Sequence, residues 1–339
     1  MVRSLNPARA PLWEFPTPCV RSPELQDLLG CGNLYVKRDD LIGYSWGGNK
    51  VRAIEFLIAD ILKCRADTVI LCGGVTSNFA ALMSAACTQR GLQVHQVSYG
   101  EPPVRIPAAM VAGQGFGTNY HFTGLQDRAS TETMAVQLEQ RLTQDGRRPY
   151  LLPRGGATPI GAMGYAYAAA ELTSQLRSMG IERATVVVPV GSGGTIAGLI
   201  AGWKRGPFKE DDPAIDLVGV CVSRPPLEMS STVQEIAQAC PYRSSEPGQV
   251  PIRLSYRIVE GRGGGFGTVD EDDAAWIRIV EETGMHVDAT YNAKALKWMR
   301  SAATELKGTV VYWHTGGVFG VIDRLCEGIC AGTSKEIQK

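Results

Sequence analysis

A glycine-rich turn of sequence Gly-Ser-Gly-Gly-Thr occupies residues 191–195, between a valine-rich run and an apolar helical pattern. Glycines let backbone N–H groups approach a ligand closely, and the start of a helix adds positive partial charge. The turn lacks the lysine of GxxxxGK[ST] and the spacing of GxGxxG, so neither a nucleoside triphosphate nor a dinucleotide is favoured. A tight turn for close helix–sheet packing is the alternative, and we interpret the segment as a phosphate-binding turn.

A lysine at position 50 follows Gly47, Gly48 and Asn49 and directly precedes an amphipathic run. A cation is disfavoured at a helix N-terminus, although a fully solvated lysine would do no harm there. A lysine that faces a pocket of positive potential loses its proton more easily, and a neutral amine can form a Schiff base with an aldehyde. A phosphate-binding turn and an amine nucleophile together indicate an aldehyde-bearing phosphate cofactor, of which pyridoxal 5′-phosphate is the obvious one.

Two other turns place polar side chains between a strand-like run and a helical run. Ser77 and Asn78 follow Gly73 and Gly74, and Thr315 precedes two further glycines. Helix capping is the default use of such residues, but they can also present hydroxyl and amide groups to a ligand. Ligands of parallel sheets bind where strands end and helices begin, so these turns are candidate site segments.

The elements that must position these turns alternate along the chain. Apolar runs rich in valine predict strands at residues 68–72, 93–98, 183–190, 216–222 and 308–314. Apolar periodicity predicts helices over 51–62, 79–87 and 160–172, with Pro159 suited to a first helical turn. Composition indicates loops at 243–251 and 261–268. The alternation predicts an α/β protein with parallel strands and helices on both faces of the sheet.

The composition limits the class of protein. The 339 residues carry 34 basic and 34 acidic side chains, so charge favours neither a nucleic-acid partner nor a membrane surface. No apolar run is long enough for a transmembrane helix, and the N-terminal segment lacks the apolar core expected of a secretory signal. Nine cysteines without CxxC predict reduced thiols and a cytoplasmic protein, and four histidines without ligand spacing predict no metal site.

An ordered set of motifs resembles the D-cysteine desulfhydrase / 1-aminocyclopropane-1-carboxylate (ACC) deaminase family. The set comprises KRDDL at 37–41, GGNK at 47–50, SN at 77–78, GSGGT at 191–195, DATYNAK at 288–294 and HTGG at 314–317. The resemblance implies the tryptophan synthase β-like fold of pyridoxal phosphate enzymes, with two open, twisted, mostly parallel sheets. It further implies a large cofactor-binding domain (1–51 and 166–339), a small mobile domain (52–165) and a homodimer.

The resemblance also implies roles in holding the cofactor. Lys50 forms the Schiff base, and Asn78 hydrogen-bonds the phenolic oxygen. Asn292 falls where the family places its partner to the pyridine nitrogen, with Thr315 close by. The residues that bind the phosphate are Ser192, Gly193, Gly194 and Thr195.

The same resemblance assigns substrate contacts. Lys50 moves the Cα proton, Ser77 lies near the carboxylate or the reacting atom, and Tyr291 stands over the substrate as an acid or base. Asn78, Phe79 and Phe266 complete the substrate-binding set.

Several positions depart from the family pattern. Asn292 replaces the glutamate of ACC deaminases, and an amide is less able than a carboxylate to keep the pyridine nitrogen protonated. Phe266 replaces a second active-site tyrosine, and Phe79 replaces a histidine common in desulfhydrases. Ala53 replaces a basic residue and Thr76 a glutamine. These changes argue against ACC ring opening and indicate a more apolar pocket for a small, specialised amino acid.

The sequence therefore predicts a pyridoxal phosphate enzyme that removes a β-substituent from a small amino acid, giving a 2-oxo acid and ammonia. β-Replacement, retro-aldol cleavage and racemisation need only the same residues and remain alternatives. A catalytically inactive binding protein of the same fold is a second class of hypothesis, supported by the lost tyrosine and opposed by the retained Lys50. A dinucleotide oxidoreductase is a third class of hypothesis, but such an enzyme would have no role for Lys50.

Overall fold

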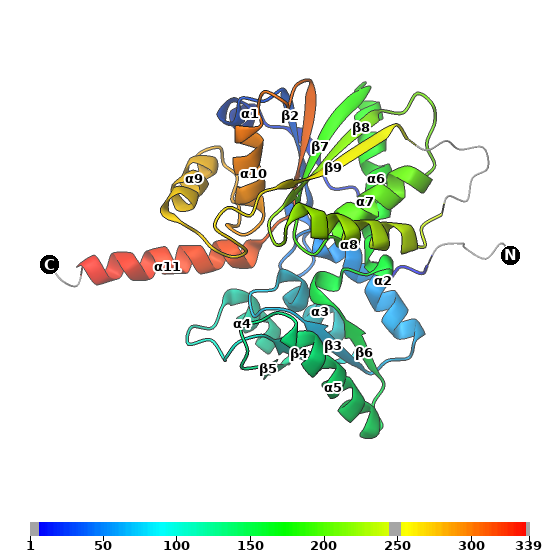
Figure 1. The fold of residues 1–339 in the computed structure, drawn as a ribbon, viewed down its shortest axis with the longest axis vertical. Helices are drawn as coiled ribbons and strands as arrows, with labels where there is room; N and C mark the ends of the chain where they lie inside the picture. Colours follow the sequence, from blue (N-terminus) through cyan, green and yellow to red (C-terminus); the bar gives the residue numbers. More distant parts are fainter. Residues whose placement is uncertain (1–6, 244–251, 337–339) are drawn as a thin grey trace.

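The computed structural model describes residues 7–243 and 252–336, and in this part of the chain it contains two sheets (Figure 1). The larger sheet has the order β1-β2-β10-β7-β8-β9, and the smaller has the order β5-β4-β3-β6. The only antiparallel pair among the described strands is β1 with β2. The predicted α/β fold with two mostly parallel sheets is therefore confirmed.

The strands of the larger sheet are β1 (Cys19–Arg21), β2 (Asn33–Arg38), β7 (Arg183–Val190), β8 (Ala214–Cys221), β9 (Leu254–Glu260) and β10 (Thr309–His314). Those of the smaller sheet are β3 (Thr68–Cys72), β4 (Gln93–Ser98), β5 (Asn119–Phe122) and β6 (Pro149–Leu152). The five strands predicted from apolar runs correspond to β3, β4, β7, β8 and β10. The other five are short, carry charges or lie at sheet edges, so no apolar run marks them.

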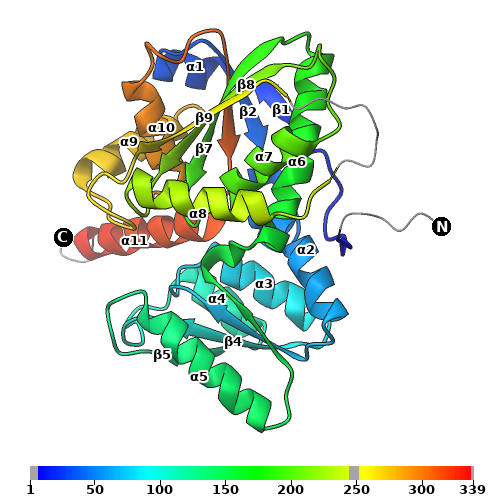
Figure 2. The ribbon, with the colours of Figure 1, turned by 45° about the vertical axis from the view of Figure 1, so that its right-hand side comes forward.

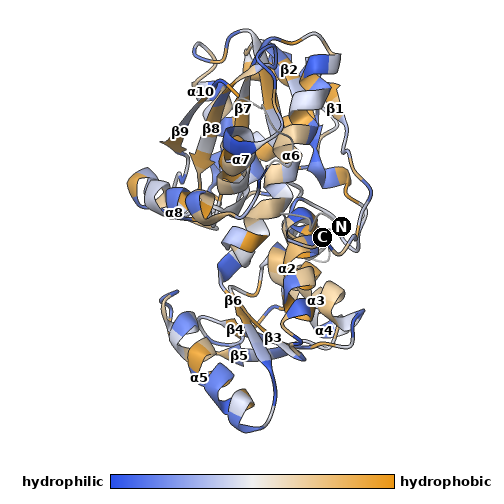
Figure 3. Ribbon diagram, turned by 90° about the vertical axis from the view of Figure 1, so that its right-hand side faces the viewer, coloured by the Kyte–Doolittle hydropathy of each residue, from blue (hydrophilic) through white to orange (hydrophobic). Residues whose placement is uncertain are grey.

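Helices cover both faces of the larger sheet (Figures 1 and 2). Helices α6 (Pro159–Ser178), α7 (Gly194–Arg205) and α8 (Pro226–Ala239) pack on one face. Helices α1 (Pro23–Leu29), α9 (Glu271–Glu281) and α10 (Asn292–Ser301) pack on the other. Side chains alternate along β7: Val186 and Val188 join the first layer, whereas Val187 joins the second. Both faces are thus apolar, and Figure 3 shows hydrophobic residues along β7 and β8.

The smaller sheet is covered in the same way. Val69 and Leu71 of β3 pack with α2 (Lys50–Lys63) and α3 (Asn78–Thr88). Ile70 and Cys72 face the opposite way, toward α5 (Ser130–Gln144). Helix α4 (Ala108–Gly115) packs beside α11 (Val318–Glu336). Among the described residues, no helix combines the length and apolar character needed to span a bilayer.

The predicted limits of the small domain, 51/52 and 165/166, fall inside α2 and α6. These two helices pack against each other and connect the sheets. The mobility of the 52–165 domain stays a prediction. Pro159 occupies the first turn of α6 as expected, with the Thr158 hydroxyl accepting a hydrogen bond from Gly161 N.

A buried charge cluster of Lys37, Asp39, Arg52 and Glu171 fixes α2 against β2 and α6. The Arg52 guanidinium donates to Asp39 at 2.8 and 2.9 Å and to Glu171 at 2.9 Å, and Lys37 pairs with Glu171. Burial alone would raise the pKa of the Asp39 carboxyl, but Arg52 and Lys37 hold it below its ordinary value. Arg52 lies two residues after Lys50, so the cluster sets the position of the helix that carries the lysine.

Candidate active site

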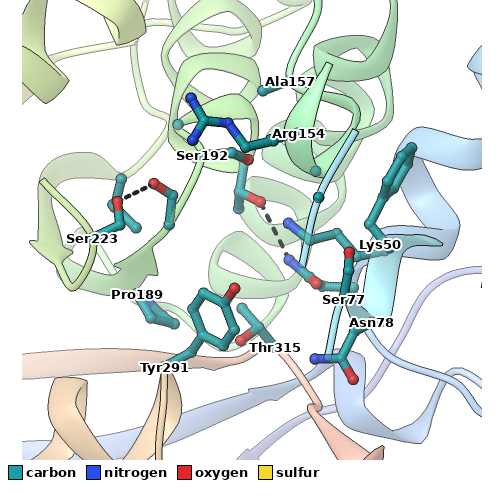
Figure 4. Close-up of a pocket in the computed structure, with 18 of the residues that line it drawn as sticks. Lys50, Ser77, Asn78, Arg154, Ala157, Pro189, Ser192, Ser223, Tyr291 and Thr315 are labelled. Carbon is teal, nitrogen blue, oxygen red and sulfur yellow. Dashed lines mark hydrogen bonds between the residues drawn. The ribbon is translucent and has the colours of Figure 1, made fainter. Parts of the chain in front are cut away.

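A cavity of about 370 Å³ lies between the carboxyl ends of strands from the two sheets. All four turns identified from the sequence contribute to its wall, as expected for ligand sites of parallel sheets. Of the twelve predicted site residues, all but Gly194 line it. Figure 4 shows that the side chains of Lys50, Ser192 and Tyr291 approach this space from different elements.

Lys50 is the first residue of α2 and carries its amine to the cavity wall. Within the described part of the chain, no hydrogen-bond acceptor or carboxylate pairs with this amine. Burial lowers its pKa to about 8, because the charged form loses hydration without gaining a partner. Gly48, at φ 95°, allows the preceding turn to pass close to Thr315 and Gly316. The amine is therefore unpaired, reachable from the cavity and easily deprotonated.

The turn at 191–195 has the form of an anion-binding cradle. Gly193 caps α7 at φ 95°, and a Cβ there would lie 3.1 Å from Met229 Sδ. The Asn49 amide donates to Thr195 Oγ1 at 3.2 Å and so joins the cradle to the lysine turn. Gly194 faces Ala157 rather than the cavity. An unpaired amine and an anion-binding cradle in the wall of one cavity fit an aldehyde cofactor that carries a phosphate.

Ser77 caps α3, and its hydroxyl oxygen accepts a hydrogen bond from Ala80 N at 3.2 Å. Its own O–H remains able to donate into the cavity. Asn78 lines the cavity beside it, whereas Phe79 lies mostly in the core, with its ring against Gly156. Capping and ligand contact, which were alternatives in the sequence, are thus compatible for Ser77.

Asn292 is a buried hydrogen-bonding centre. Its amide donates to Asp288 Oδ1 at 2.6 Å and to Gly316 O at 2.7 Å. Its carbonyl oxygen accepts from the Tyr312 hydroxyl at 2.7 Å and from the backbone N–H and the hydroxyl of Thr315. Both amide hydrogens are therefore already used, and the hydroxyl of Thr315 is the group beside Asn292 that can still exchange partners. The contact of Asn292 with a pyridine nitrogen stays a prediction.

Tyr291 and Phe266 meet at the cavity, with ring centroids 5.9 Å apart in an edge-to-face arrangement. Burial and the nearby Asp288 carboxyl raise the pKa of Tyr291, so its phenol keeps its proton near neutral pH. A Cβ at Gly191 would lie 2.7 Å from the Tyr291 ring, which explains why glycine occupies that position. The 261–268 segment is a loop, as predicted.

Sequence reasoning missed several polar residues that line the cavity: Tyr99, Arg128, Glu132, Arg154, Ser223, Arg224 and Asp288. Asp288 accepts hydrogen bonds from the backbone of residues 290–292 and thereby holds the turn that carries Tyr291. Ser223 donates to Gly191 O at 2.5 Å and supports the cradle. Tyr99 and Ser223 could have been found from the sequence, because each directly follows a valine-rich run that predicts a strand. Ala53, in contrast, is buried in the core and does not line the cavity.

In the ranges that the structure describes, no group of three or more His, Cys, Asp or Glu side chains could hold a metal ion. The described cysteines are all free thiols. Burial raises the pKa of the Cys72 thiol to about 11 and that of Cys87 to about 12, so both thiols stay protonated.

Comparison with known proteins agrees with this site. Residues 11–316 match the model of the family described as "Pyridoxal-phosphate dependent enzyme". A putative 1-aminocyclopropane-1-carboxylate deaminase of Pyrococcus furiosus is 32% identical over 313 residues, covering 91% of each chain. A D-cysteine desulfhydrase of Salmonella typhimurium is 32% identical over 326 residues, covering 91% of this chain and 94% of its own. The crystal structure of an ACC deaminase homologue superposes with a TM-score of 0.79 at 29% identity, covering 93% of both chains.

The chain belongs to the pyridoxal-phosphate dependent enzyme family. Within that family it falls in the group of ACC deaminases and D-cysteine desulfhydrases, as the motifs indicated. It is therefore a pyridoxal phosphate-dependent enzyme of the lyase and deaminase type. The alternatives of an inactive binding protein and of a dinucleotide oxidoreductase are set aside by this membership.

Proposed function

We propose that the enzyme removes a β-substituent from a small amino acid, in the manner of a D-cysteine desulfhydrase, and releases a 2-oxo acid and ammonia. The observation that supports this most strongly is the unpaired Lys50 amine, which lies in one cavity with the glycine cradle and the Tyr291 phenol. The Salmonella typhimurium relative is a D-cysteine desulfhydrase, which makes this reaction type the natural first candidate.

The residues of the cavity divide into a cofactor-binding and a substrate-binding part. Lys50 would hold pyridoxal phosphate covalently, and Ser192, Gly193 and Thr195 would receive its phosphate. Asn78 would contact the phenolic oxygen, and Thr315, oriented by Asn292, would lie toward the pyridine nitrogen. When bound, the cofactor stabilises negative charge at the substrate Cα.

The chain supplies the proton transfers. The Lys50 amine, with a pKa of about 8, is neutral often enough near neutral pH to accept the Cα proton. The Cβ–X bond then breaks, and the leaving group departs with the bonding electrons. Tyr291, which retains its proton, would protonate that group. Water converts the resulting 2-aminoacrylate into the 2-oxo acid and ammonia, which balances the reaction.

The turn at 73–78 is the proposed site for the substrate carboxylate. Its backbone N–H groups precede α3, where the helix start favours an anion, and the Ser77 hydroxyl can donate as well. The cavity also admits β-replacement, retro-aldol cleavage and racemisation. ACC ring opening is the least supported outcome, because Phe266 has no hydroxyl and Asn292 has no carboxylate.

Three further expectations belong with this proposal. The 52–165 domain closes over the substrate, the enzyme works as a homodimer, and it acts in the cytoplasm. The first follows from a cavity built between two sheets, the second from the resemblance, and the third from the free thiols.

The test is a screen of D- and L-amino acids with β-leaving groups, and of ACC, for release of a 2-oxo acid. We expect release from at least one β-substituted amino acid, and none from the Lys50→Ala variant. Turnover of ACC without turnover of any β-substituted amino acid would refute the proposal.

A further inference from the structure

Several polar groups that line the cavity have no part in the proposed reaction, and two of them are the Tyr99 hydroxyl and the Arg128 guanidinium. Tyr99 follows β4, and Arg128 lies between β5 and α5. Because β4 and β5 are neighbouring parallel strands, the segments that follow them leave the same edge of the sheet. The two loops are also joined directly, since Gly100 N donates to Leu125 O at 2.6 Å. The fold therefore brings both groups to one side of the cavity.

Arg128 is a half-buried cation without a carboxylate partner in the described part of the chain. Its Cζ lies 4.1 Å from the centroid of the Phe266 ring, and that ring in turn contacts Tyr291. Arg154, which also lines the cavity, is different because it pairs with Glu132 at 3.1 Å. A guanidinium held on the face of an aromatic ring keeps its N–H donors free for an anion.

The Tyr99 hydroxyl is likewise available to a ligand. Its oxygen lies 3.0 Å from the position that a Cβ of residue 74 would take, so glycine at 74 makes room for it. No protein group among the described residues hydrogen-bonds to this hydroxyl. It therefore lies against the turn that leads to Ser77, which is the site proposed above for the substrate carboxylate.

The other anions of the proposed reaction already have their sites. The cofactor phosphate is provided for by the 191–195 cradle, and the α-carboxylate by the 73–78 turn. We infer that the substrate carries a second anionic group on its β-carbon, which the Arg128 guanidinium binds with help from the Tyr99 hydroxyl. The substrate class is thus an amino acid with a phosphate or sulfonate β-substituent.

This inference rests on the proposed function and extends it to the leaving group. With O-phosphoserine the Cβ–O bond breaks, and phosphate departs with the electron pair. With cysteate the Cβ–S bond breaks, and sulfite departs. In both cases Lys50 takes the Cα proton, and water turns 2-aminoacrylate into pyruvate and ammonia.

The kinetic test compares O-phosphoserine and cysteate with β-chloroalanine, a neutral substrate, as both enantiomers. We expect the wild type to prefer the acidic pair. Arg128→Gln should raise KM for the acidic substrates by about 10- to 150-fold, the loss expected for one hydrogen bond to a charged group. KM for β-chloroalanine should change by less than about threefold. Arg128→Lys should recover part of the loss, and Arg21→Gln, which removes an exposed charge outside the cavity, should change neither.

A binding test separates this inference from the reaction itself. Aspartate and alanine have no good leaving group, so their binding can be followed through the absorbance of the cofactor. Tighter binding of aspartate by the wild type, lost in Arg128→Gln, would support the second anion site even if no amino acid released a 2-oxo acid. Equal binding of the two, or equal weakening of both in Arg128→Gln, would overturn it, because Arg128 would then serve the α-carboxylate or the fold.

Discussion

Replacing Arg52 by methionine should destabilise the enzyme strongly, because Arg52 is the centre of the buried charge cluster. The change removes two hydrogen bonds to Asp39 and two to Glu171, all between 2.8 and 2.9 Å. It leaves one cation, Lys37, facing two carboxylates, of which Asp39 is fully buried. Breaking a buried ion pair by removing one partner costs about 3–5 kcal/mol of unfolding free energy. We expect a loss in that range for Arg52→Met.

The double variant Arg52→Met/Asp39→Asn is the matched control. It restores charge balance, since Lys37 then faces Glu171 alone. Its destabilisation should be smaller than the sum of the two single changes by about 1–3 kcal/mol. Urea unfolding followed by far-UV circular dichroism, with excess pyridoxal phosphate, measures all four proteins. A loss below about 1 kcal/mol for Arg52→Met, or strict additivity in the double variant, would refute the importance assigned to the cluster.

The cluster also has a defined pH dependence. The folded protein holds the pKa values of Asp39 and Glu171 below their ordinary values of 3.8 and 4.5. The stabilisation is therefore present above those ordinary values and is lost as pH falls through the folded values, where both carboxylates take up protons. The stability difference between wild type and Arg52→Met should shrink in acid and stay constant near neutral pH.

Two further changes probe the cradle and the smaller sheet. Gly193→Ala should weaken cofactor binding, because alanine is strained by about 1–2 kcal/mol at φ 95° and its Cβ approaches Met229 Sδ. Gly180→Ala is the control, since Gly180 has φ 69° but no neighbour close to the added Cβ. In a fluorescence titration with pyridoxal phosphate, the Gly180 variant should bind as the wild type does, although its stability is lower. His95 is hydrogen-bonded to His121 at 2.9 Å, and burial lowers its pKa from 6.5 to about 4. The unfolded chain therefore takes up a proton at this histidine before the folded protein does, which destabilises the fold in acid. The urea concentration at the unfolding midpoint should decrease when the pH is lowered from about 8 to about 5. His95→Gln should flatten that fall, and an unchanged pH profile would contradict the assignment.

The strands that could be predicted are those whose neighbours in the sheet make them apolar on both faces. Residues 68–72 and 93–98 match β3 and β4 to the residue, because helices cover both sides of the smaller sheet. β2 escaped prediction because it contains Lys37 and Arg38. Lys37 is stable inside this buried strand because its amine contacts Thr17 O, Glu171 and Gln175, and a local pattern cannot show partners so distant in the sequence.

The site residues also divide into those that local sequence predicts and those that only the tertiary structure reveals. Lys50, Ser77 and the 191–195 cradle could be found because glycine turns after strands are local signals of ligand binding. Arg128 could not, because it stands in a polar loop and reaches the cavity only since β5 lies beside β4. The hydrogen bonds of Asn292 also depend on Tyr312 and Gly316, which tertiary structure alone brings to it.

The attachment of the cofactor to Lys50 can be measured directly. The purified enzyme should show an absorbance band at roughly 410–430 nm, as expected of a pyridoxal Schiff base. Borohydride reduction followed by peptide mass spectrometry should then find the pyridoxyl phosphate group on Lys50, and Lys50→Ala should lack both the band and the label. A label on another lysine, such as the buried Lys37 or Lys294, or a colourless protein that takes up no pyridoxal phosphate, would contradict the assignment of Lys50 as the cofactor-binding amine.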